Sequence, residues 1–75
     1  MSPTSARLGS EPTARELSVL RMLAVDGRSH RQIADELEIS PHTVRFHIER
    51  LRRRVGAATI AQATWLLRDR LEIAS

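Results

Sequence analysis

The sequence predicts a small all-α domain of four helices whose third helix contacts another molecule. At 75 residues the chain has room for one domain with a single core. Aromatic residues make up only 3% of it, so the core must be built from Leu, Ile and Val side chains, which suits packed helices. Apolar residues recur at helical spacing, and no stretch shows the sustained alternation of a β-strand.

Helix starts are indicated by capping boxes, in which a Ser or Thr side chain accepts from the N3 amide and an N3 Glu or Gln reaches back. Three pairs fit this pattern: Thr13 with Glu16, Ser29 with Gln32, and Thr59 with Gln62. A fourth start is the cap Ser40, followed by Pro41 in the first turn, where a missing amide donor costs the helix nothing. Residues 1–12 are rich in Ser, Pro and Gly and are expected to form a flexible arm ahead of a domain at 13–75.

Four helices are therefore expected, over residues 14–25, 30–37, 41–55 and 60–73. Gly27 is expected to end the first of them, because glycine takes a left-handed cap freely. The helical periodicity predicts that these side chains face the core: Leu17, Leu20, Leu23, Ala24, Ile33, Ala34, Leu37, Val44, Ile48, Leu51, Val55, Ile60, Ala63, Leu67 and Leu71.

The second and third helices, with three residues between them, have the spacing of a helix-turn-helix. Ala34 is small enough for the two helices to approach closely, and Ile39 supplies an apolar plug for the turn. Glu38 departs from the many such turns that have glycine, so we expect some backbone strain or a different turn.

Basic charge is concentrated on the third helix. All 12 basic residues are arginine, and residues 41–55 hold five of them against Glu49 alone, a net +4 in a chain of net +3. A single basic helix on a nearly neutral scaffold indicates a nucleic-acid-binding protein. Arginine content by itself also fits a GC-rich genome, whereas the concentration of basic charge on one helix favours nucleic-acid binding.

The helical wheel assigns roles to the exposed face of this helix. Recognition helices read bases mainly with their N-terminal half, so Arg45 is expected to contact guanine, Phe46 a thymine methyl group and Glu49 the amino group of cytosine. Phosphate contacts, which position without specifying, are expected from Ser29, His42, Thr43, Arg50, Arg53 and Arg54. One alternative stays open for each of two residues. Phe46 packs over the helix-turn-helix instead of contacting a base, and Glu49 only pairs with Arg45 or Arg53.

The fourth helix is expected to carry a dimer interface at Ala61, Trp65 and Leu66, which lie away from its inward face. Burying Trp65 against a symmetry mate would remove a large apolar surface from water and set two recognition helices about one DNA turn apart. Because this interface is small, dimerisation is expected mainly on DNA. The alternative is that Trp65 folds back over the first helix at the rim of the core.

Catalytic, cofactor and metal sites are not expected. The chain has no cysteine, and no carboxylate or thiolate completes a metal site with His30, His42 and His47. It has no nucleophile and base pair and no Gly-rich phosphate loop, which argues against an enzyme. With no secretory signal and no apolar stretch of roughly 20 residues, we expect a soluble cytoplasmic protein without membrane contact.

A resemblance to a known family covers nearly everything outside the N-terminal arm. The chain resembles the DNA-binding domain of LuxR-type (GerE-like) bacterial transcription regulators over the run TARELSVLRMLAVDGRSHRQIADELEISPHTVRFHIERLRRRVGAATIAQA. Residue types match the family pattern at Thr13, Arg15, Glu16, Val19, Leu20, Gly27, Ser29, Ile33, Ala34, Leu37, Ile39, Ser40, Thr43, Val44, His47, Gly56 and Ala63. The resemblance implies a third helix in the major groove, base contacts at Arg45, Phe46 and Glu49, and a fourth helix that often dimerises.

The chain also departs from this family pattern. Pro12 stands where the family usually has Leu, and Ile60 where it commonly has Arg. Family members usually carry a receiver or ligand-binding domain in front, which these 75 residues do not include, so the resemblance does not extend to signal-dependent control.

Together these observations predict a sequence-specific regulator of transcription that binds double-stranded DNA as a homodimer. Its other expected partner is RNA polymerase or another regulator, and its expected location is the bacterial nucleoid when it is bound. One alternative is a promoter-recognition module like sigma factor region 4, although such modules generally stop soon after the recognition helix. The other is an antiactivator that binds a larger regulator through the Trp65 surface without touching DNA.

Overall fold

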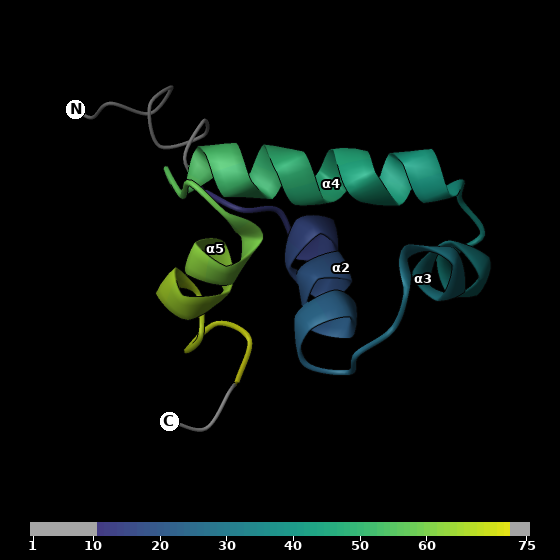
Figure 1. The fold of residues 1–75 in the computed structure, drawn as a ribbon, viewed down its shortest axis with the longest axis horizontal. Coiled ribbons are helices and arrows are strands. Elements are labelled where there is room, and N and C mark those ends of the chain that lie inside the picture. Colours follow the sequence, from purple (N-terminus) through teal and green to yellow (C-terminus); the bar gives the residue numbers. More distant parts are fainter. Residues whose placement is uncertain (1–10, 73–75) are drawn as a thin grey trace.

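The computed structural model describes residues 11–72, which form four α-helices. These are α2 (Ala14–Ala24), α3 (His30–Leu37), α4 (Pro41–Arg54) and α5 (Ile60–Leu66) (Figure 1). No strand occurs in this part of the chain. The all-α class and the four helices predicted from the sequence are confirmed, whereas most of the expected flexible arm lies outside the described residues.

The first two capping boxes form as predicted. Thr13 Oγ1 accepts from the Glu16 amide at 3.1 Å, and Glu16 Oε1 accepts from the Thr13 amide at 3.0 Å. Ser29 Oγ accepts from the Gln32 amide at 3.1 Å, and Gln32 Oε1 accepts from the Ser29 amide at 2.8 Å. Each box satisfies amides that the first helical turn leaves without an intrahelical partner, which explains why α2 and α3 begin where they do.

The starts of α4 and α5 use simpler caps. Ser40 Oγ accepts from the amide of Thr43 at 3.1 Å, with Pro41 as the first helical residue. Thr59 Oγ1 accepts from the Gln62 amide at 3.0 Å, but Gln62 Oε1 accepts from the amide before the cap, that of Ala58, at 2.6 Å. The third predicted capping box is therefore only half formed, although the helix begins at the predicted residue.

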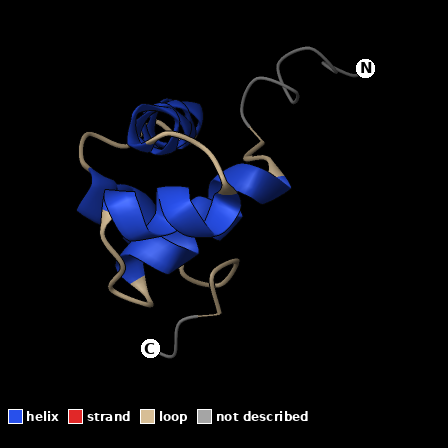
Figure 2. Ribbon diagram, turned by 90° about the vertical axis from the view of Figure 1, so that its right-hand side faces the viewer, coloured by secondary structure: helices blue, strands red, loops and turns tan. Residues whose placement is uncertain are grey.

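The long helix α4 lies along one side of the molecule, and the other three helices pack on its opposite side (Figures 1 and 2). Their packing buries a continuous apolar core, formed by Val19, Leu20, Ile33, Ala34, Val44, Ile48, Leu51, Ala57, Ala63, Leu67 and Leu71. A further set is partly buried against it: Leu17, Met22, Leu23, Leu37, Ile39, Val55 and Ile60. The predicted core is therefore largely confirmed, and one side of α4 carries no other described helix.

Apart from the partly buried side chains, the core differs from the predicted one at three positions. Val19 and Ala57 are buried without having been expected there. The prediction that Ala24 faces the core is wrong, because its side chain is exposed. Ala24 is the last residue of α2, at the end of that helix that lies farther from α4 (Figure 1), so helical spacing from Leu20 does not carry it into the core.

The turn between α3 and α4 holds Glu38 in a strained backbone conformation. Glu38 has φ 60° and ψ 44°, the left-handed conformation that costs a residue other than glycine about 1–2 kcal/mol. The Ile39 amide donates to the carbonyl of Ala34 at 3.0 Å, which closes the end of α3. The expected backbone strain at Glu38 is thus present, and Ile39 packs against the core as the predicted plug.

The predicted extension of the fourth helix to residue 73 is wrong, because α5 ends at Leu66. The amide of Arg68 donates to the Trp65 carbonyl at 3.3 Å, and Arg68 Nη1 donates to the same carbonyl at 2.8 Å. Both bonds tighten the end of the helix into turns that continue through residue 72, while Ile73 lies outside the described residues.

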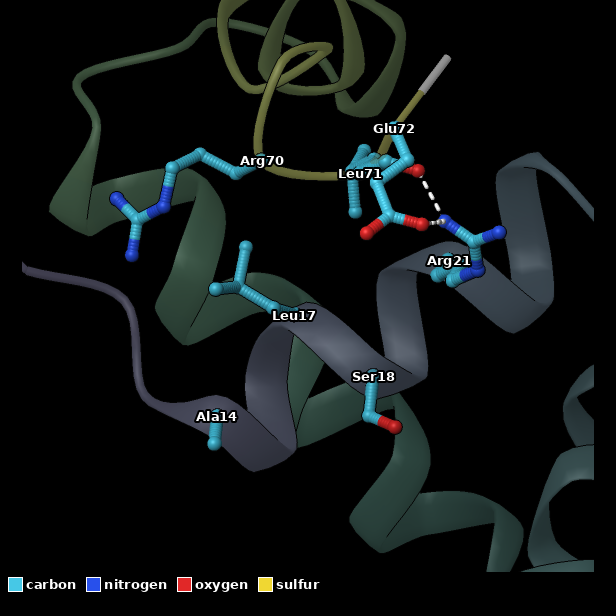
Figure 3. A pocket seen from close by; sticks show the side chains of 7 residues that line it. All are labelled: Ala14, Leu17, Ser18, Arg21, Arg70, Leu71 and Glu72. Carbon is cyan, nitrogen blue, oxygen red and sulfur yellow. Dashed lines mark hydrogen bonds and ion pairs between the residues drawn. The ribbon is translucent and has the colours of Figure 1, made fainter.

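These turns bring the C-terminal segment back to α2 (Figure 3). Arg21 Nη1 donates to the carbonyl of Leu71 and lies 3.6 Å from a carboxylate oxygen of Glu72. The two contacts border a hollow of about 380 Å³ between α2 and the segment. The Leu71 carbonyl is thus bonded to Arg21 of α2, and the Leu71 side chain reaches the core.

Candidate nucleic-acid interface

The exposed side of α4 follows from the spacing of its apolar residues. Val44, Ile48 and Leu51 are buried at intervals of four and three, so the opposite side of the helix faces solvent. We call the residues there the α4 outer face: His42, Arg45, Phe46, Glu49, Arg50 and Arg53. They border a shallow recess of about 300 Å³. Three arginines against one glutamate make this face positive, as binding to a phosphate backbone requires.

Arg45 and Arg53 are the most available cations of the α4 outer face. Both side chains are exposed, and neither has an ion pair or a hydrogen bond with another described residue. Their guanidinium donors are therefore open to a ligand. The structure places Arg45 in the N-terminal half of α4 and Arg53 at its C-terminal end.

Phe46 lies in the open, contrary to the alternative in which it packs over the helix-turn-helix. Its side chain is 52% exposed. The guanidinium carbon of Arg50 lies 5.5 Å from the centre of its ring, and the His47 ring lies 6.3 Å away. A half-exposed ring beside a cation is a surface that can make apolar contact with a base.

Glu49 is held by an arginine, but by neither of the two that its sequence spacing suggested. Arg52 Nη2 donates to Glu49 Oε1 at 2.8 Å, and Arg52 Nε donates to the same oxygen at 3.2 Å. These hydrogen bonds, together with the charges of Arg52, Arg53 and Arg45, hold the pKa of the Glu49 carboxyl below its usual value. Glu49 is thus an ionised acceptor at neutral pH.

A second carboxylate, that of Glu16, connects α2 with the C-terminal part of α4. Glu16 is only 2% exposed, and both of its carboxylate oxygens lie 3.2 Å from Nε of Arg54. Nε of Arg50 lies 3.6 Å from Glu16 Oε2. The side chain of Arg54 is only 14% exposed, whereas that of Arg50 is 49% exposed. Of the two arginines, Arg50 therefore remains within reach of a ligand while Arg54 is turned inward.

The remaining residues expected at phosphate lie at the starts of two helices. Ser29 is exposed at the N-cap of α3, and its hydroxyl already accepts the capping bond. His42 is exposed in the first turn of α4. Thr43 is half-buried there, with Oγ1 at 3.0 Å from Oγ of Ser40. His42 is thus part of the α4 outer face, whereas Ser29 lies at the start of α3.

The residues expected at a dimer interface are exposed on α5. Trp65 is 60% exposed and Leu66 is 50% exposed, and Ala61 is exposed one turn earlier. The alternative in which Trp65 folds back as the rim of the core is therefore wrong. The guanidinium carbon of Arg68 lies 4.0 Å from the centre of the Trp65 ring and covers part of it.

Two residues of this region have contacts that the sequence did not reveal. Glu16 has a detectable signal as the N3 residue of a capping box, but its partner Arg54 is 38 positions away and becomes visible only in the fold. Arg52 has a weaker signal, because it follows Glu49 by three residues, a spacing at which helical side chains meet. Arg45 and Arg53 were the partners expected in its place.

Other kinds of site receive no support in the part of the chain that the structure describes. Residues 11–72 contain no group of three or more His, Asp or Glu side chains arranged to hold a metal ion. None of the helices in that range is long and apolar enough to cross a membrane.

The arrangement defines the class of protein. A short helix and a turn plugged by Ile39 precede a longer helix with a basic, open outer face, which is the geometry of a DNA-binding helix-turn-helix domain. Residues 12–67 match the family described as bacterial regulatory proteins, luxR family. The chain therefore belongs to the luxR family, whose members are DNA-binding transcription regulators, and the resemblance noted in the sequence is confirmed.

Two curated relatives are similar to this chain over 54 residues. A nitrate/nitrite response regulator protein homolog from Haemophilus influenzae is 44% identical, over 72% of this chain and 26% of the relative. The nitrate/nitrite response regulator protein NarP from Escherichia coli is 46% identical, over 72% of this chain and 25% of NarP. The chain thus spans about a quarter of the length of the curated relatives it matches. No solved structure gives a significant match.

Proposed function

We propose that this domain recognises a specific double-stranded DNA sequence by placing α4 in the major groove, as the DNA-reading part of a bacterial transcription regulator. The observation that carries the proposal is the α4 outer face, which is positive, lies on the side of α4 away from the other helices, and holds two arginines that make no ion pair or hydrogen bond with another described residue. A major groove about 12 Å wide admits one such helix.

Within this proposal the DNA-contacting residues form two groups. Arg45, Phe46 and Glu49 read bases, with a guanidinium for guanine, a ring for a thymine methyl group and a carboxylate for cytosine. Arg50 and Arg53, with His42, Thr43 and Ser29, contact phosphates and set the register of the helix. Arg54 contributes to phosphate binding only through its charge, because its guanidinium is turned to Glu16.

The experiment that tests this function is selection of bound sequences from a random duplex library, followed by titrations at several salt concentrations. We expect one enriched motif, and with 3 to 5 phosphates per subunit a log–log salt slope of about −3 to −5 per subunit. Absence of binding at low salt, or a flat salt response, would contradict the proposal.

The homodimer is a separate part of the proposal and depends on α5. Trp65 and Leu66 are large apolar side chains left in water, and burying a Trp against a second copy contributes roughly 2 to 3 kcal/mol per side. The pairing is weak in the free protein and forms mainly on DNA, because the surface is small. It places two recognition helices about one DNA turn apart, so a palindromic site is expected.

Trp65→Ala tests this interface, because a side chain that is 60% exposed can be removed without unfolding the domain. Circular dichroism should show an unchanged fold. Sedimentation on a duplex with two half-sites should show the variant bound mainly as a monomer. A folded variant that still binds as a dimer would remove α5 from the interface.

The same exposed Trp65 and Leu66 favour a second candidate, an antiactivator that binds a larger regulator through α5 and does not touch DNA. RNA polymerase or another regulator is a further proposed partner of this surface, and the nucleoid is the proposed location. The helix α5 and the family membership argue against the sigma-like alternative. A protein that shows no DNA binding in the selection, but needs Trp65 to capture a regulator, would support the antiactivator.

A further inference from the structure

Arg52 is fixed at both ends of its guanidinium. Nε and Nη2 donate to Oε1 of Glu49 at 3.2 Å and 2.8 Å, and Nη1 donates to the carbonyl of Ala57 at 2.9 Å. Ala57 is a core residue, only 5% exposed, in the loop between α4 and α5. The Arg52 side chain is itself only 24% exposed. Hydrogen bonds within the protein thus fix the position of the Arg52 side chain.

This arrangement determines how Glu49 presents its carboxylate. Both bonds from Arg52 end on Oε1, so Oε2 is left as the acceptor for a ligand. The Glu49 side chain remains 44% exposed on the α4 outer face. A long side chain on a helix surface ordinarily samples several rotamers and loses that freedom on binding. A side chain already held in one rotamer loses less, which favours one hydrogen-bonding geometry over others.

We infer that Arg52 is a positioning residue for base recognition: anchored on the Ala57 carbonyl, it holds Oε1 of Glu49 so that Oε2 faces the DNA. The inference rests on the proposed function, in which Glu49 accepts a hydrogen bond from a cytosine amino group. The role needs the planar fork of an arginine, which reaches a carboxylate through two nitrogens and a carbonyl through a third. Lysine has the same charge but a single nitrogen, so Arg52→Lys separates positioning from charge.

The experiment is selection from a random duplex library with the wild type, Glu49→Gln, Arg52→Lys and the double variant. Arg15→Lys, an exposed arginine on α2, is the matched control. We expect Glu49→Gln to flatten the preference at one base pair by about fivefold or more. Arg52→Lys should flatten the same base pair and leave the other positions unchanged, the double variant should add nothing there, and Arg15→Lys should retain the wild-type motif.

Two outcomes overturn the inference in distinguishable ways. If Glu49→Gln flattens a base pair and Arg52→Lys does not, Arg52 has no positioning role, while base reading by Glu49 stands. If Glu49→Gln changes no position, the base-reading part of the proposed function fails and the inference fails with it. Thermal unfolding of each variant shows whether it is folded at the assay temperature. The Arg52→Gln variant is put through the same selection in parallel. It is expected to flatten the preference at the same base pair, so the result does not depend on one substitution.

Discussion

Two glutamate–arginine pairs meet on α4, and they differ in what surrounds them. Glu16 and Arg54 are 2% and 14% exposed and join α2 to α4 across 38 positions of sequence. Glu49 and Arg52 are 44% and 24% exposed and lie three positions apart on one helix. The chemistry is the same in both pairs, so the difference lies in their burial and in how far apart the partners are in sequence. We therefore expect that breaking the Glu16–Arg54 pair destabilises the fold, and that breaking the Glu49–Arg52 pair changes only the exposed surface. The arginines of α4 therefore do not all present their guanidinium groups to solvent in the same way.

The largest effect is expected on breaking the buried pair. Glu16→Ala should lower the free energy of unfolding by about 3 kcal/mol, because it removes the carboxylate beside a mostly buried guanidinium and also the capping bond to Thr13. Urea denaturation followed by circular dichroism measures this loss.

The matched control is Glu49→Ala in the exposed pair, which should change the same free energy by no more than about 0.5 kcal/mol. Glu16→Gln should lose less than Glu16→Ala, because Gln at N3 can still form the capping bond. Equal losses from Glu16→Ala and Glu49→Ala would show that burial does not separate the two pairs.

The next effect concerns Arg45, which belongs to neither pair. Since its guanidinium makes no ion pair or hydrogen bond within residues 11–72, Arg45→Ala should leave stability unchanged and weaken binding to the selected site by roughly 1 to 3 kcal/mol. Fluorescence anisotropy with the selected duplex and with variants at each base pair measures both affinity and the expected relaxation at one position. Unchanged affinity would make Arg45 only a solvated surface residue.

A smaller effect distinguishes the neighbours Arg53 and Arg54. Arg53→Ala should weaken all duplexes about equally and reduce the log–log salt slope by about 0.9, the equivalent of one phosphate. Arg54→Ala should lower the free energy of unfolding and change that slope less, because its guanidinium is turned to Glu16. The same salt titration on both variants decides the matter. If Arg54→Ala also reduces the slope by about 0.9, Arg54 contacts a phosphate, as the sequence predicted.

The sequence predicted the helix starts, which depend on neighbours within one helical turn. The caps at Thr13, Ser29, Ser40 and Thr59 are local, so all four helix starts were predicted correctly. The end of α5 was not, because it depends on turns that lead the chain back to a hydrogen bond between Arg21 and the Leu71 carbonyl, 50 positions apart.

The same distinction applies to the candidate site. The exposed side of α4 follows from the helical spacing of its apolar residues, and the structure has Arg45, Phe46 and Arg53 exposed there as expected. Which carboxylate each arginine contacts could not be predicted, because several spacings are compatible with a helix. Arg52 contacts Glu49 while its third nitrogen reaches a loop carbonyl that the sequence does not locate.

The smallest expected effect is the titration of Glu49. Because hydrogen bonds from Arg52 lower the pKa of its carboxyl in the folded state, this pair stabilises the fold above the ordinary pKa of 4.5 and ceases to do so as pH falls through the lowered value. NMR titration of the carboxyl should give a pKa below 4.5 in the wild type and a higher one in Arg52→Gln. An identical pKa in both proteins would show that the pair does not form in solution.

The contact between Glu16 and Arg54 bears on attempts to transplant α4 between members of the family. A graft of residues 41–54 into another member of the family would introduce a guanidinium that needs a carboxylate on the recipient's first helix. It would also introduce Arg52, whose third nitrogen needs the carbonyl of a loop outside the graft. The exchangeable unit is therefore smaller than the helix: the outer-face side chains can be swapped singly, while the arginines at 52 and 54 stay with their scaffold.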